Sequence, residues 1–467
     1  MADVSGAPPF AGRTVLVCGV GVAGASAGAA LLRAGARVLL SATQESAAST
    51  ELVAAGARYV GDLRMVPAGV DAVIASPGLK PQVALLVDAR ARGLPVLGEI
   101  ELAWQLRGTT PAPWLAVTGT NGKTTTVHML ESILGAAGLR ALAVGNVGVP
   151  IIDAVLADEP YDVLAVELSS QQLQSAPSIA PAAGALLNVA ADHLDWHGSM
   201  QAYALAKTRV WQGAVAIGNL DDAAVVRLFD AVEPSRRVGV TLRAPAPGQF
   251  GVVDGTLVER AADGTITALV AADLIRPAGA HNVSNALFAA ALARAHGLGA
   301  AEIERGLLAF VPDPHRNVLI ATVAGVDYVD DSKATNPHAA AASLTAYQPV
   351  VWIAGGQLKD APVDELVRAV APRLRGAVLL GADRDVLAAG FARHAPDLPL
   401  IKVARTDDGA MTEVVRAAAG MARPGDTVLL APAAASYDMF SGYGARGDAF
   451  ATAVAGLGAL PEANELP

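Results

Sequence analysis

The stretch TGTNGKTTT, residues 118–126, has the residue types of a phosphate-binding loop. Its backbone N–H groups can surround a phosphate, and the ammonium of Lys123 can neutralise the β- and γ-phosphates. Thr124 can offer its hydroxyl to Mg²⁺. The usual loop has a further glycine five residues before Gly122, where this chain has Val117. We therefore interpret the loop as a shortened form that binds ATP.

Acidic and imidazole side chains follow two further apolar segments. Glu167 ends the run VLAVE, where a buried carboxylate is costly unless it meets a cation such as the Mg²⁺ of bound ATP. Beyond the run GALLNV lie four polar residues that could form a metal cluster or a capped, solvated loop: Asp192, His193, Asp195 and His197. From these residue types alone we favour His193 as the functional side chain.

Lysine is scarce in this chain, which has 28 arginines and 6 lysines. Four of the six lysines lie in segments that also contain other candidate functional residues: Lys123, Lys207, Lys333 and Lys359. A compact ammonium can lose its proton or act as a point charge, and a guanidinium does not replace it. Lys207, on an expected helix over 200–211, would by itself be interpreted as a surface lysine.

The stretch VCGVGVAGAS, residues 17–26, has the glycine spacing of a nucleotide-binding turn between a strand and a helix. A dinucleotide site also needs an acidic residue at the end of the second strand, where this chain has Ser41. The pattern therefore favours a phosphate-binding helix terminus over NAD. The ASPG segment, residues 75–78, is either a second ligand-binding turn or a plain strand-to-helix turn.

Apolar runs that alternate with alanine-rich stretches must position these residues. The runs are TVLVCG, AVIASPG, WLAVTG, VLAVEL, VVWIAGG, AVLLG and TVLLAP. Continuous apolar strands are buried on both faces of a parallel sheet, so the sequence predicts a doubly wound α/β fold. Proline-interrupted stretches near 107–114 and 310–317 predict three domains: 1–109, 110–312 and 313–467. Turn signals predict β-hairpins within 240–270.

A long helix is expected after residue 279, with Asn282 and Asn285 three apart on its first turn. One of them would cap the helix and the other would be available for a ligand. In the last domain, charged or hydroxyl-bearing loops follow strands, as in a lid that closes on substrate: PDPHRNV, VDDSKATNP and LAPAAASYDMFSGYGARG.

Composition excludes several classes of protein. Of the 467 residues, 53% are hydrophobic and 17% charged, which excludes a disordered chain. A net charge of −10 leaves no broad basic face, so we expect no nucleic-acid partner. The single cysteine, Cys18, allows no disulfide framework and suits a reducing cytoplasm. Residues 14–32 are uncharged, but four glycines interrupt them, so we expect neither export nor membrane insertion.

Taken together, these segments resemble the Mur ligase family over nearly the whole chain. The family loop reads G-[ST]-N-G-K-[ST], and GTNGKT matches it, which explains the shortened form. The segments VDDSKATNP, GGQLKD and APAAASYDMF look like the branch that adds D-glutamate to UDP-N-acetylmuramoyl-L-alanine with ATP. The resemblance implies an amide ligase of peptidoglycan precursor synthesis that acts through an acyl phosphate, as a cytoplasmic monomer with small-molecule partners.

The resemblance also assigns the domains and the site residues. It implies a Rossmann-like N-terminal domain for the UDP-sugar, a central P-loop ATPase domain with a mainly parallel sheet, and a Rossmann-like C-terminal domain that binds D-glutamate and closes on ATP. Residues expected at ATP are Gly119, Thr120, Asn121, Gly122, Lys123, Thr124, Thr125, Asn282, Asn285, Arg316 and Asp331. Residues expected at the UDP-sugar are Gly21, Val22, Ala23, Gly24, Ser76, Pro77, Gly78, Asn146 and His193.

For D-glutamate, the residues implied are Lys333, Thr335, Lys359, Ser436 and Tyr443. Two Mg²⁺ ions would be held by Thr124, Glu167, His193 and Lys207. A carbamate derived from CO₂ on Lys207 would turn that cation into an anionic oxygen ligand. The catalytic residues implied are Lys123, His193, Lys207 and Arg316.

Two residues depart from the family pattern. Ser41 stands where the family often has an acidic residue near uracil, and Tyr443 stands where a phenylalanine is expected.

Three alternative functions remain: a folate ligase that uses L-glutamate, an NAD-dependent oxidoreductase that rests on the first glycine pattern alone, and a nucleotide-binding scaffold without turnover. The second would bind nicotinamide, and the third would bind ATP without hydrolysis.

Overall fold

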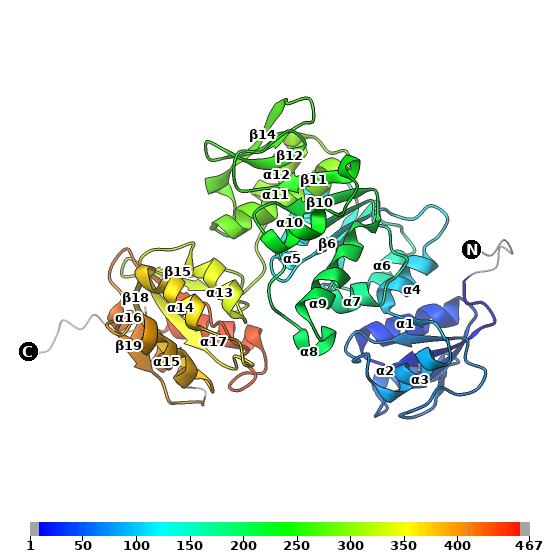
Figure 1. Cartoon of the computed structure of the whole chain (residues 1–467). Coiled ribbons are helices and arrows are strands. Elements are labelled where there is room, and N and C mark those ends of the chain that lie inside the picture. The colour runs from blue at the N-terminus through cyan, green and yellow to red at the C-terminus, as the bar shows by residue number, and fades with distance from the viewer. Residues whose placement is uncertain (1–8, 408, 458–467) are drawn as a thin grey trace, which may run out of the picture. The chain divides into compact units, whose positions relative to one another are not determined.

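The computed structural model describes residues 9–407 and 409–457, which form three β-sheets with helices packed against them (Figure 1). The chain divides into two compact units. The first holds residues up to 274 together with 284–310, and the second holds 275–283 and the residues from 311 on. The α/β class predicted from the sequence is confirmed. The predicted boundaries at 109 and 312 stay a prediction.

The N-terminal sheet has five parallel strands in the order β3-β2-β1-β4-β5. Its strands are β1 (Thr14–Cys18), β2 (Arg37–Ser41), β3 (Arg58–Tyr59), β4 (Ala72–Ala75) and β5 (Val96–Leu97). Its helices are α1 (Val22–Arg33), α2 (Ala47–Ala54), α3 (Ala84–Ala91) and α4 (Glu99–Leu106). α1 and α2 pack in one hydrophobic cluster and α3 in another, so the sheet is covered on both faces.

The carboxyl ends of β1 and β4 bring the two N-terminal glycine-containing turns together. The N–H of Ser76 donates to the carbonyl of Cys18 at 2.9 Å. Gly24 has to be glycine, because a Cβ there would lie 1.9 Å from the carbonyl oxygen of Gly19. The two turns therefore lie side by side at the edge of the sheet where open α/β sheets bind ligands.

The central sheet has nine strands in the order β14-β13-β12-β11-β10-β9-β6-β8-β7. Its strands are β6 (Trp114–Thr118), β7 (Ala141–Gly145), β8 (Val163–Glu167), β9 (Ala183–Leu186), β10 (Val215–Asn219), β11 (Arg237–Val240), β12 (Gln249–Val253), β13 (Thr256–Arg260) and β14 (Ile266–Ala271). Neighbouring strands pair in parallel from β7 along the sheet to β12, whereas β12 with β13 and β13 with β14 pair antiparallel. The predicted hairpins within 240–270 are confirmed.

The helices around the central sheet are α5 (Lys123–Ala136), α6 (Ile151–Val155), α7 (Ser170–Gln174), α8 (Leu194–His197), α9 (Met200–Lys207), α10 (Ala223–Phe229), α11 (Ala280–Ala295) and α12 (Ala300–Ala309). Short 3₁₀ helices span Thr208–Gln212, Pro234–Arg236 and Ala272–Leu274. α5 follows β6 after the short loop 119–122 and buries Val127, Leu130 and Ile133, which fixes its first turn over the end of the strand.

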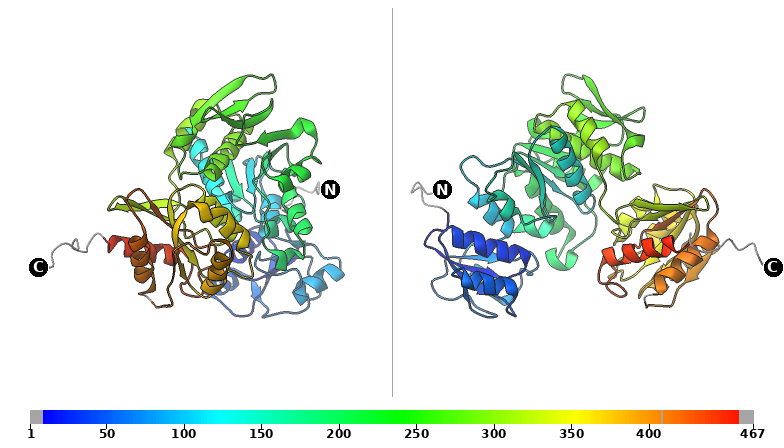
Figure 2. Two further views of the ribbon diagram at one scale, coloured as in Figure 1. Left: turned by 60° about the vertical axis from the view of Figure 1, so that its left-hand side comes forward. Right: turned by 180° about the vertical axis from the view of Figure 1, so that it is seen from behind.

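The C-terminal sheet has six strands in the order β15-β16-β20-β17-β18-β19, and only the pairing of β15 with β16 is antiparallel. Its strands are β15 (Val318–Val323), β16 (Val326–Asp330), β17 (Val350–Gly355), β18 (Leu374–Leu380), β19 (Leu400–Lys402) and β20 (Thr427–Leu430). Its helices are α13 (Pro337–Leu344), α14 (Asp364–Val370), α15 (Arg384–His394), α16 (Ala410–Met421) and α17 (Tyr443–Ala455), with a 3₁₀ turn over Ala371–Arg373. α13 to α15 cover one face and α16 and α17 the other (Figure 2).

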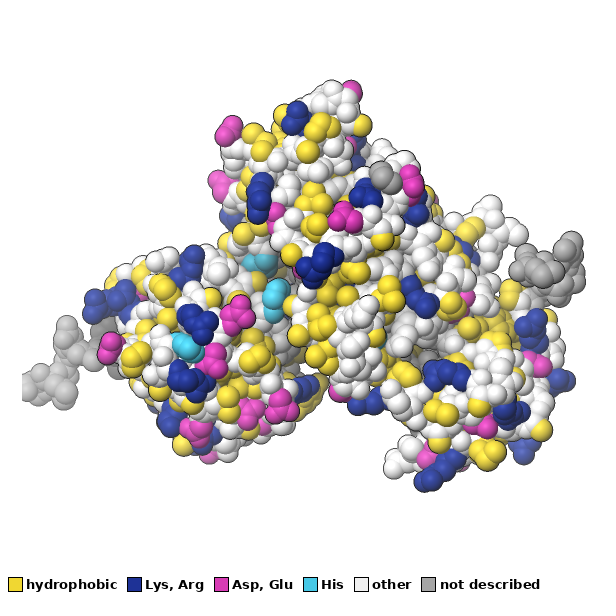
Figure 3. Space-filling model, in the orientation of Figure 1, with side chains coloured by type: hydrophobic (Ala, Val, Ile, Leu, Met, Phe, Trp, Pro, Cys, Tyr) yellow, Lys and Arg dark blue, Asp and Glu magenta, His cyan; other side chains and the backbone are white. Residues whose placement is uncertain are grey.

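The surface carries charges of both signs. On the face drawn in Figure 3, basic and acidic side chains are interspersed. In the part of the chain that the structure describes, none of the helices has the length and apolarity needed to cross a bilayer. Cys18 is buried in β1 with 2% of its surface exposed, and burial raises the pKa of its thiol to about 12.

Candidate functional site

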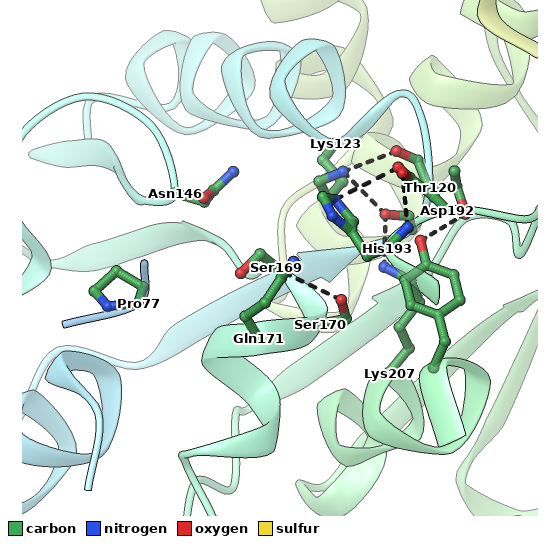
Figure 4. Close-up of a pocket in the computed structure, with 12 residues that line it drawn as sticks. Pro77, Thr120, Lys123, Asn146, Ser169, Ser170, Gln171, Asp192, His193 and Lys207 are labelled. Carbon is green, nitrogen blue, oxygen red and sulfur yellow. Dashed lines mark hydrogen bonds and ion pairs between the residues drawn. The ribbon is translucent and has the colours of Figure 1, made fainter. Parts of the chain in front are cut away.

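A pocket of about 310 Å³ opens in the first compact unit, at the carboxyl ends of the central strands (Figure 4). Its lining comes from loops far apart in the sequence. The lining residues are Pro77, Gly119, Thr120, Lys123, Asn146, Ser169, Ser170, Gln171, Asp192, His193, Tyr203 and Lys207. Seven of the predicted site residues are among them: Pro77, Gly119, Thr120, Lys123, Asn146, His193 and Lys207.

The phosphate-binding loop turns tightly between β6 and α5. Gly122 has φ +84° at the start of α5, and a Cβ there would lie 2.5 Å from Oδ1 of Asn285. The ammonium of Lys123 donates to the carbonyls of Gly119 and Thr120, both at 2.9 Å. The positive charge and the helix N-terminus thus lie together at the pocket, which favours an anionic ligand.

Two backbone N–H groups of this loop, which were expected to surround a phosphate, donate to a side chain of the protein instead. The N–H groups of Thr120 and Asn121 donate to Oδ1 of Asn188, at 3.0 and 2.9 Å, so they do not point into a ring around a phosphate. Asn188, which follows β9 by two residues, was not among the predicted residues. A phosphate would therefore meet the first turn of α5, where Lys123 and Thr124 begin the helix.

Glu167, at the end of β8, is 2% exposed and has its carboxylate held from two sides. Oε2 accepts a hydrogen bond from the hydroxyl of Thr124 at 2.7 Å, and Oε1 accepts one from the amide of Asn146 at 2.8 Å. A hydroxyl and a carboxylate are the hard oxygen ligands that Mg²⁺ prefers, so this pair fits one such ion. Among the described residues, no three His, Cys, Asp or Glu side chains converge as a metal site.

Lys207 is buried, with 1% of its surface exposed, which corrects its interpretation as a surface lysine. Its Nζ donates to the carbonyl of Gly119 at 2.8 Å and lies 4.6 Å from the ring centre of Tyr203. Burial lowers the pKa of the amine well below its usual value, and the nearby charge of Lys123 lowers it further. An uncharged amine is a nucleophile, which an exposed lysine at neutral pH is not.

The four polar residues after β9 do not form one cluster. Nε2 of His193 lies 3.5 Å from the carboxylate of Asp192, and both line the pocket. Asp195 instead pairs with Lys80 at 2.9 Å, and Nε2 of His197 lies 2.9 Å from the hydroxyl of Ser170. The metal-cluster alternative is therefore not supported, and His193 is the histidine at the pocket.

The N-terminal turns contribute Pro77 to the pocket lining. Asn146 and His193 also line the pocket. Of the remaining residues expected at the UDP-sugar, Gly21 precedes α1, Val22, Ala23 and Gly24 form its first turn, and Ser76 and Gly78 follow β4. Val22 is 77% exposed there. Ser41 is buried, and its hydroxyl accepts the N–H of Leu63 at 3.2 Å, so it closes a loop of the protein itself.

Asn282 and Asn285 both lie inside α11, after its first residue Ala280, so the expectation that one caps the helix is wrong. Asn285 lies against Gly122 of the phosphate-binding loop. Both side chains are buried, at 3% and 6% exposure.

In the second unit, several predicted residues gather around the end of β16. Arg316 pairs with Asp313 at 3.2 Å, and burial raises the pKa of Asp331 to about 7. The ammonium of Lys333 lies 3.9 Å from the ring centre of Tyr443, so the ring that departs from the family pattern holds a lysine. Thr335, Lys359 and Ser436 lie on the neighbouring loops; Lys359 has φ +52° and Ser436 is 3% exposed.

Arg446, which was not among the predicted residues, connects two of these loops by hydrogen bonds. It is 1% exposed, and its guanidinium donates to Oγ and the carbonyl of Ser332 and to the carbonyl of Ala434, at 2.9, 2.8 and 3.0 Å. Only its place in the segment SGYGARG could have indicated it. The pocket residues Ser169, Ser170, Gln171 and Tyr203 were also missed, because a Ser-rich helix start and an aromatic in a helix are usually structural.

Comparisons with known proteins agree along the chain. Residues 117–293 match the Mur ligase middle domain, and residues 315–434 match the Mur ligase glutamate ligase domain. UDP-N-acetylmuramoylalanine--D-glutamate ligases from Streptomyces coelicolor and Thermobifida fusca are each 52% identical, over 96% of this chain and 99% of their own.

Solved structures share the fold at lower identity. A pseudomurein peptide ligase type C from Methanothermus fervidus has a TM-score of 0.60 and 18% identity, and covers 95% of this chain and 100% of its own. MurF ligase from Thermotoga maritima, solved in complex with ADP, has a TM-score of 0.55 and 17% identity, and covers 90% of this chain and 96% of its own.

Proposed function

The chain belongs to the Mur ligase family, and we propose that it joins D-glutamate to UDP-N-acetylmuramoyl-L-alanine with hydrolysis of ATP. One observation in the structure supports the proposal independently of the names of the relatives. The pocket brings the ammonium of Lys123, the buried amine of Lys207 and the turn at Pro77 together. A phosphate donor and an anionic acceptor can therefore meet there.

We assign the UDP-sugar to the N-terminal sheet, ATP to the central sheet and D-glutamate to the second unit. The proposal rests on the ends of β1 and β4 for the first, on the loop before α5 for the second, and on Lys333, Lys359 and Ser436 for the third. Asn282, Asn285, Arg316 and Asp331 would bind the nucleotide. A cytoplasmic monomer with the domain boundaries given above fits this assignment.

The chemistry starts from a carboxylate, which is a poor electrophile in water. The γ-phosphoryl group of ATP passes to an oxygen of the L-alanyl carboxylate, which gives an acyl phosphate and releases ADP. The amine of D-glutamate attacks the acyl carbon, the tetrahedral intermediate collapses, and phosphate leaves. Lys123 would offset the negative charge that gathers between the phosphates and the carboxylate. Asp192 and His193 are the candidates to take the proton from the amine.

Mg²⁺, when bound, would supply further positive charge at the phosphates. Thr124 and Glu167 would hold one ion, and His193 with a carbamylated Lys207 would hold a second. The lowered pKa of Lys207 supports the carbamate, because only the uncharged amine attacks CO₂. Turnover of a Lys207→Ala variant at the wild-type rate, at saturating Mg²⁺ and without added short acids, would remove the carbamate from the proposal.

The test is phosphate release from Mg²⁺-ATP with UDP-N-acetylmuramoyl-L-alanine and either D-glutamate, L-glutamate or no amino acid. We expect release only with D-glutamate and a product heavier by one glutamyl residue. No release under any of the three conditions would reject the substrate assignment, and folate with L-glutamate would be tested next. Quenching of tryptophan fluorescence by a nicotinamide cofactor would favour the oxidoreductase alternative.

A further inference from the structure

Gln171 is a pocket residue that none of the steps above uses. It lies on the first turn of α7, four residues after Glu167, and it lines the pocket with Ser169 and Ser170. Figure 4 shows these three residues between Asn146 and Lys207. In this view Pro77 and Asn146 lie on one side of the three residues and Lys123 on the other, so a carboxylate that extends from Pro77 towards the phosphate donor would pass close to them (Figure 4).

The amide of Gln171 is oriented by a chain of hydrogen bonds. The hydroxyl of Ser170 donates to Oε1 of Gln171 at 3.2 Å, and the hydroxyl oxygen lies 2.9 Å from Nε2 of His197. A serine hydroxyl has one hydrogen. Since that hydrogen points to Gln171, His197 must donate its Nε2–H to Ser170.

In this chain of donors, the nitrogen end of the Gln171 amide faces the pocket. Oε1 of Gln171 is taken by Ser170, so Nε2 with its two N–H groups is the end left to a ligand. Among the described residues, no hydrogen bond of this Nε2 atom to the protein is present. The reverse orientation would require Ser170 to donate to an unprotonated Nε2 of His197, and the pocket would then present an acceptor.

The charges of the pocket favour the first orientation. The ammonium of Lys123 lines it together with the carboxylate of Asp192. An N–H donor in the same pocket as this ammonium suits an anionic oxygen, whereas an acceptor would repel it.

We infer that Gln171 donates a hydrogen bond to the L-alanyl carboxylate of the UDP-sugar and that Ser170 and His197 hold its amide in this orientation. The inference rests on the proposed function, because it takes its ligand from there. Gln171 is a substrate-binding residue in this assignment, and Ser170 and His197 are positioning residues.

The first experiment compares Gln171→Glu with Gln174→Glu. Gln174 is exposed on the same helix and accepts a hydrogen bond from Trp196, which a glutamate can also accept, so it controls for the added charge. We expect Gln171→Glu to raise the KM for the UDP-sugar by about tenfold to a hundredfold and to leave the KM for ATP within about twofold. Gln174→Glu should leave both within about twofold.

The second experiment separates orientation from packing. His197→Phe keeps a ring against Tyr203, 5.4 Å away between centres, but loses the donor, whereas His197→Gln keeps an N–H donor without the ring. We expect His197→Phe to raise the KM for the UDP-sugar by about threefold to tenfold, and His197→Gln to restore it. In a Gln171→Ala background, His197→Phe should have no further effect on this KM.

The outcomes separate this inference from the proposed function. An inactive wild-type enzyme with UDP-N-acetylmuramoyl-L-alanine and D-glutamate would reject the function. An active wild type with an unchanged KM for the UDP-sugar in Gln171→Glu would reject the role of Gln171 alone. An equal effect of His197→Phe with and without Gln171 would show that His197 acts through packing.

Discussion

The amine of Lys207 donates to the carbonyl oxygen of Gly119 across 2.8 Å, so the last residue of α9 is anchored to the first turn of the phosphate-binding loop. Both groups are shielded from water, and Lys207 is the only lysine or arginine with 1% or less of its surface exposed among the described residues of this first unit. Burial makes a positive charge on this nitrogen costly, and the proposed carbamate requires the uncharged amine.

Lys207→Met should stabilise the folded protein at neutral pH. The folded pKa lies below the usual 10.5, so the unfolded chain binds more protons between the two values, and wild-type stability rises with pH through that window. The variant lacks this penalty, so its advantage, about 1–3 kcal/mol at pH 7, should shrink towards pH 10.5. Thermal unfolding in CO₂-free buffers from pH 7 to 10 measures it. Exposed Lys402→Met is the control, and an equal gain at every pH would indicate packing instead.

Glu167→Gln should impair catalysis more than folding. The amide keeps the size of the side chain and can still bond Thr124 and Asn146, but it loses the negative charge that would hold Mg²⁺. We expect kcat/KM to fall by about a hundredfold or more, with a higher Mg²⁺ concentration for half-maximal rate. Initial rates across a Mg²⁺ titration check this, with the exposed Glu304→Gln as control. An unchanged Mg²⁺ dependence would refute the metal assignment.

Gly122→Ala should weaken ATP binding much more than Gly138→Ala. Both glycines have positive φ, +84° and +79°, so alanine strains the backbone by about 1 kcal/mol in each. Only at Gly122 would the new methyl lie 2.5 Å from Asn285, whereas nothing lies within 4 Å of a Cβ at Gly138. Isothermal titration with a non-hydrolysable ATP analogue should give a Kd about tenfold higher for the first variant alone. An equal Kd in the two variants would contradict this prediction, because it would mean that the loop shifts to accommodate the methyl group at residue 122.

Asp331→Asn should stabilise the protein above pH 7 and not near pH 4. Burial raises the folded pKa from 3.8 to about 7, so the folded chain binds more protons between these values and wild-type stability falls as pH rises through them. The asparagine variant escapes this loss. Calorimetric Tm values at pH 4, 6 and 8 measure the difference, and the exposed Asp397→Asn serves as control. A constant difference across the series would contradict the raised pKa.

Arg446→Met should destabilise the second unit and weaken D-glutamate binding together. The carbonyls of Ser332 and Ala434 would lose a buried donor, at about 1–3 kcal/mol each. Lys333 and Ser436 lie close to these carbonyls in the chain, so the KM for D-glutamate should rise. Arg446→Lys keeps the charge but lacks the planar guanidinium, so its Tm and its KM for D-glutamate should lie between those of the wild type and those of Arg446→Met. Unfolding curves and D-glutamate kinetics check it; normal KM at lowered Tm would limit Arg446 to stability.

The sequence predicted those parts of the site that depend on strand ends. Glu167 and the phosphate-binding loop follow apolar runs, and the carboxyl ends of parallel strands meet at one edge, so the pattern of residues was enough to place both. The burial of Lys207 could not be predicted, because an amphipathic helix pattern does not say what its last residue packs against. Gln171 was hidden by the capping box of Ser169 and Gln172, which looks purely structural.

Hydrogen bonds between distant segments were also beyond sequence reasoning. Asn188 occupies two N–H groups of the phosphate-binding loop from 67 positions away in the chain, and nothing in the local pattern marks it. The same holds for Asn146 and Glu167, which were assigned to different ligands and yet share a hydrogen bond.

The buried thiol of Cys18 has a practical use. It is the single cysteine of the chain, it is 2% exposed, and its raised pKa keeps the reactive thiolate scarce at neutral pH. Maleimide dyes should therefore ignore the native protein and attach only to cysteines introduced at exposed positions. A pair such as Glu51→Cys in the first unit and Asp397→Cys in the second would carry a donor and an acceptor fluorophore, so the separation of the two units could be followed during turnover without first removing a native residue.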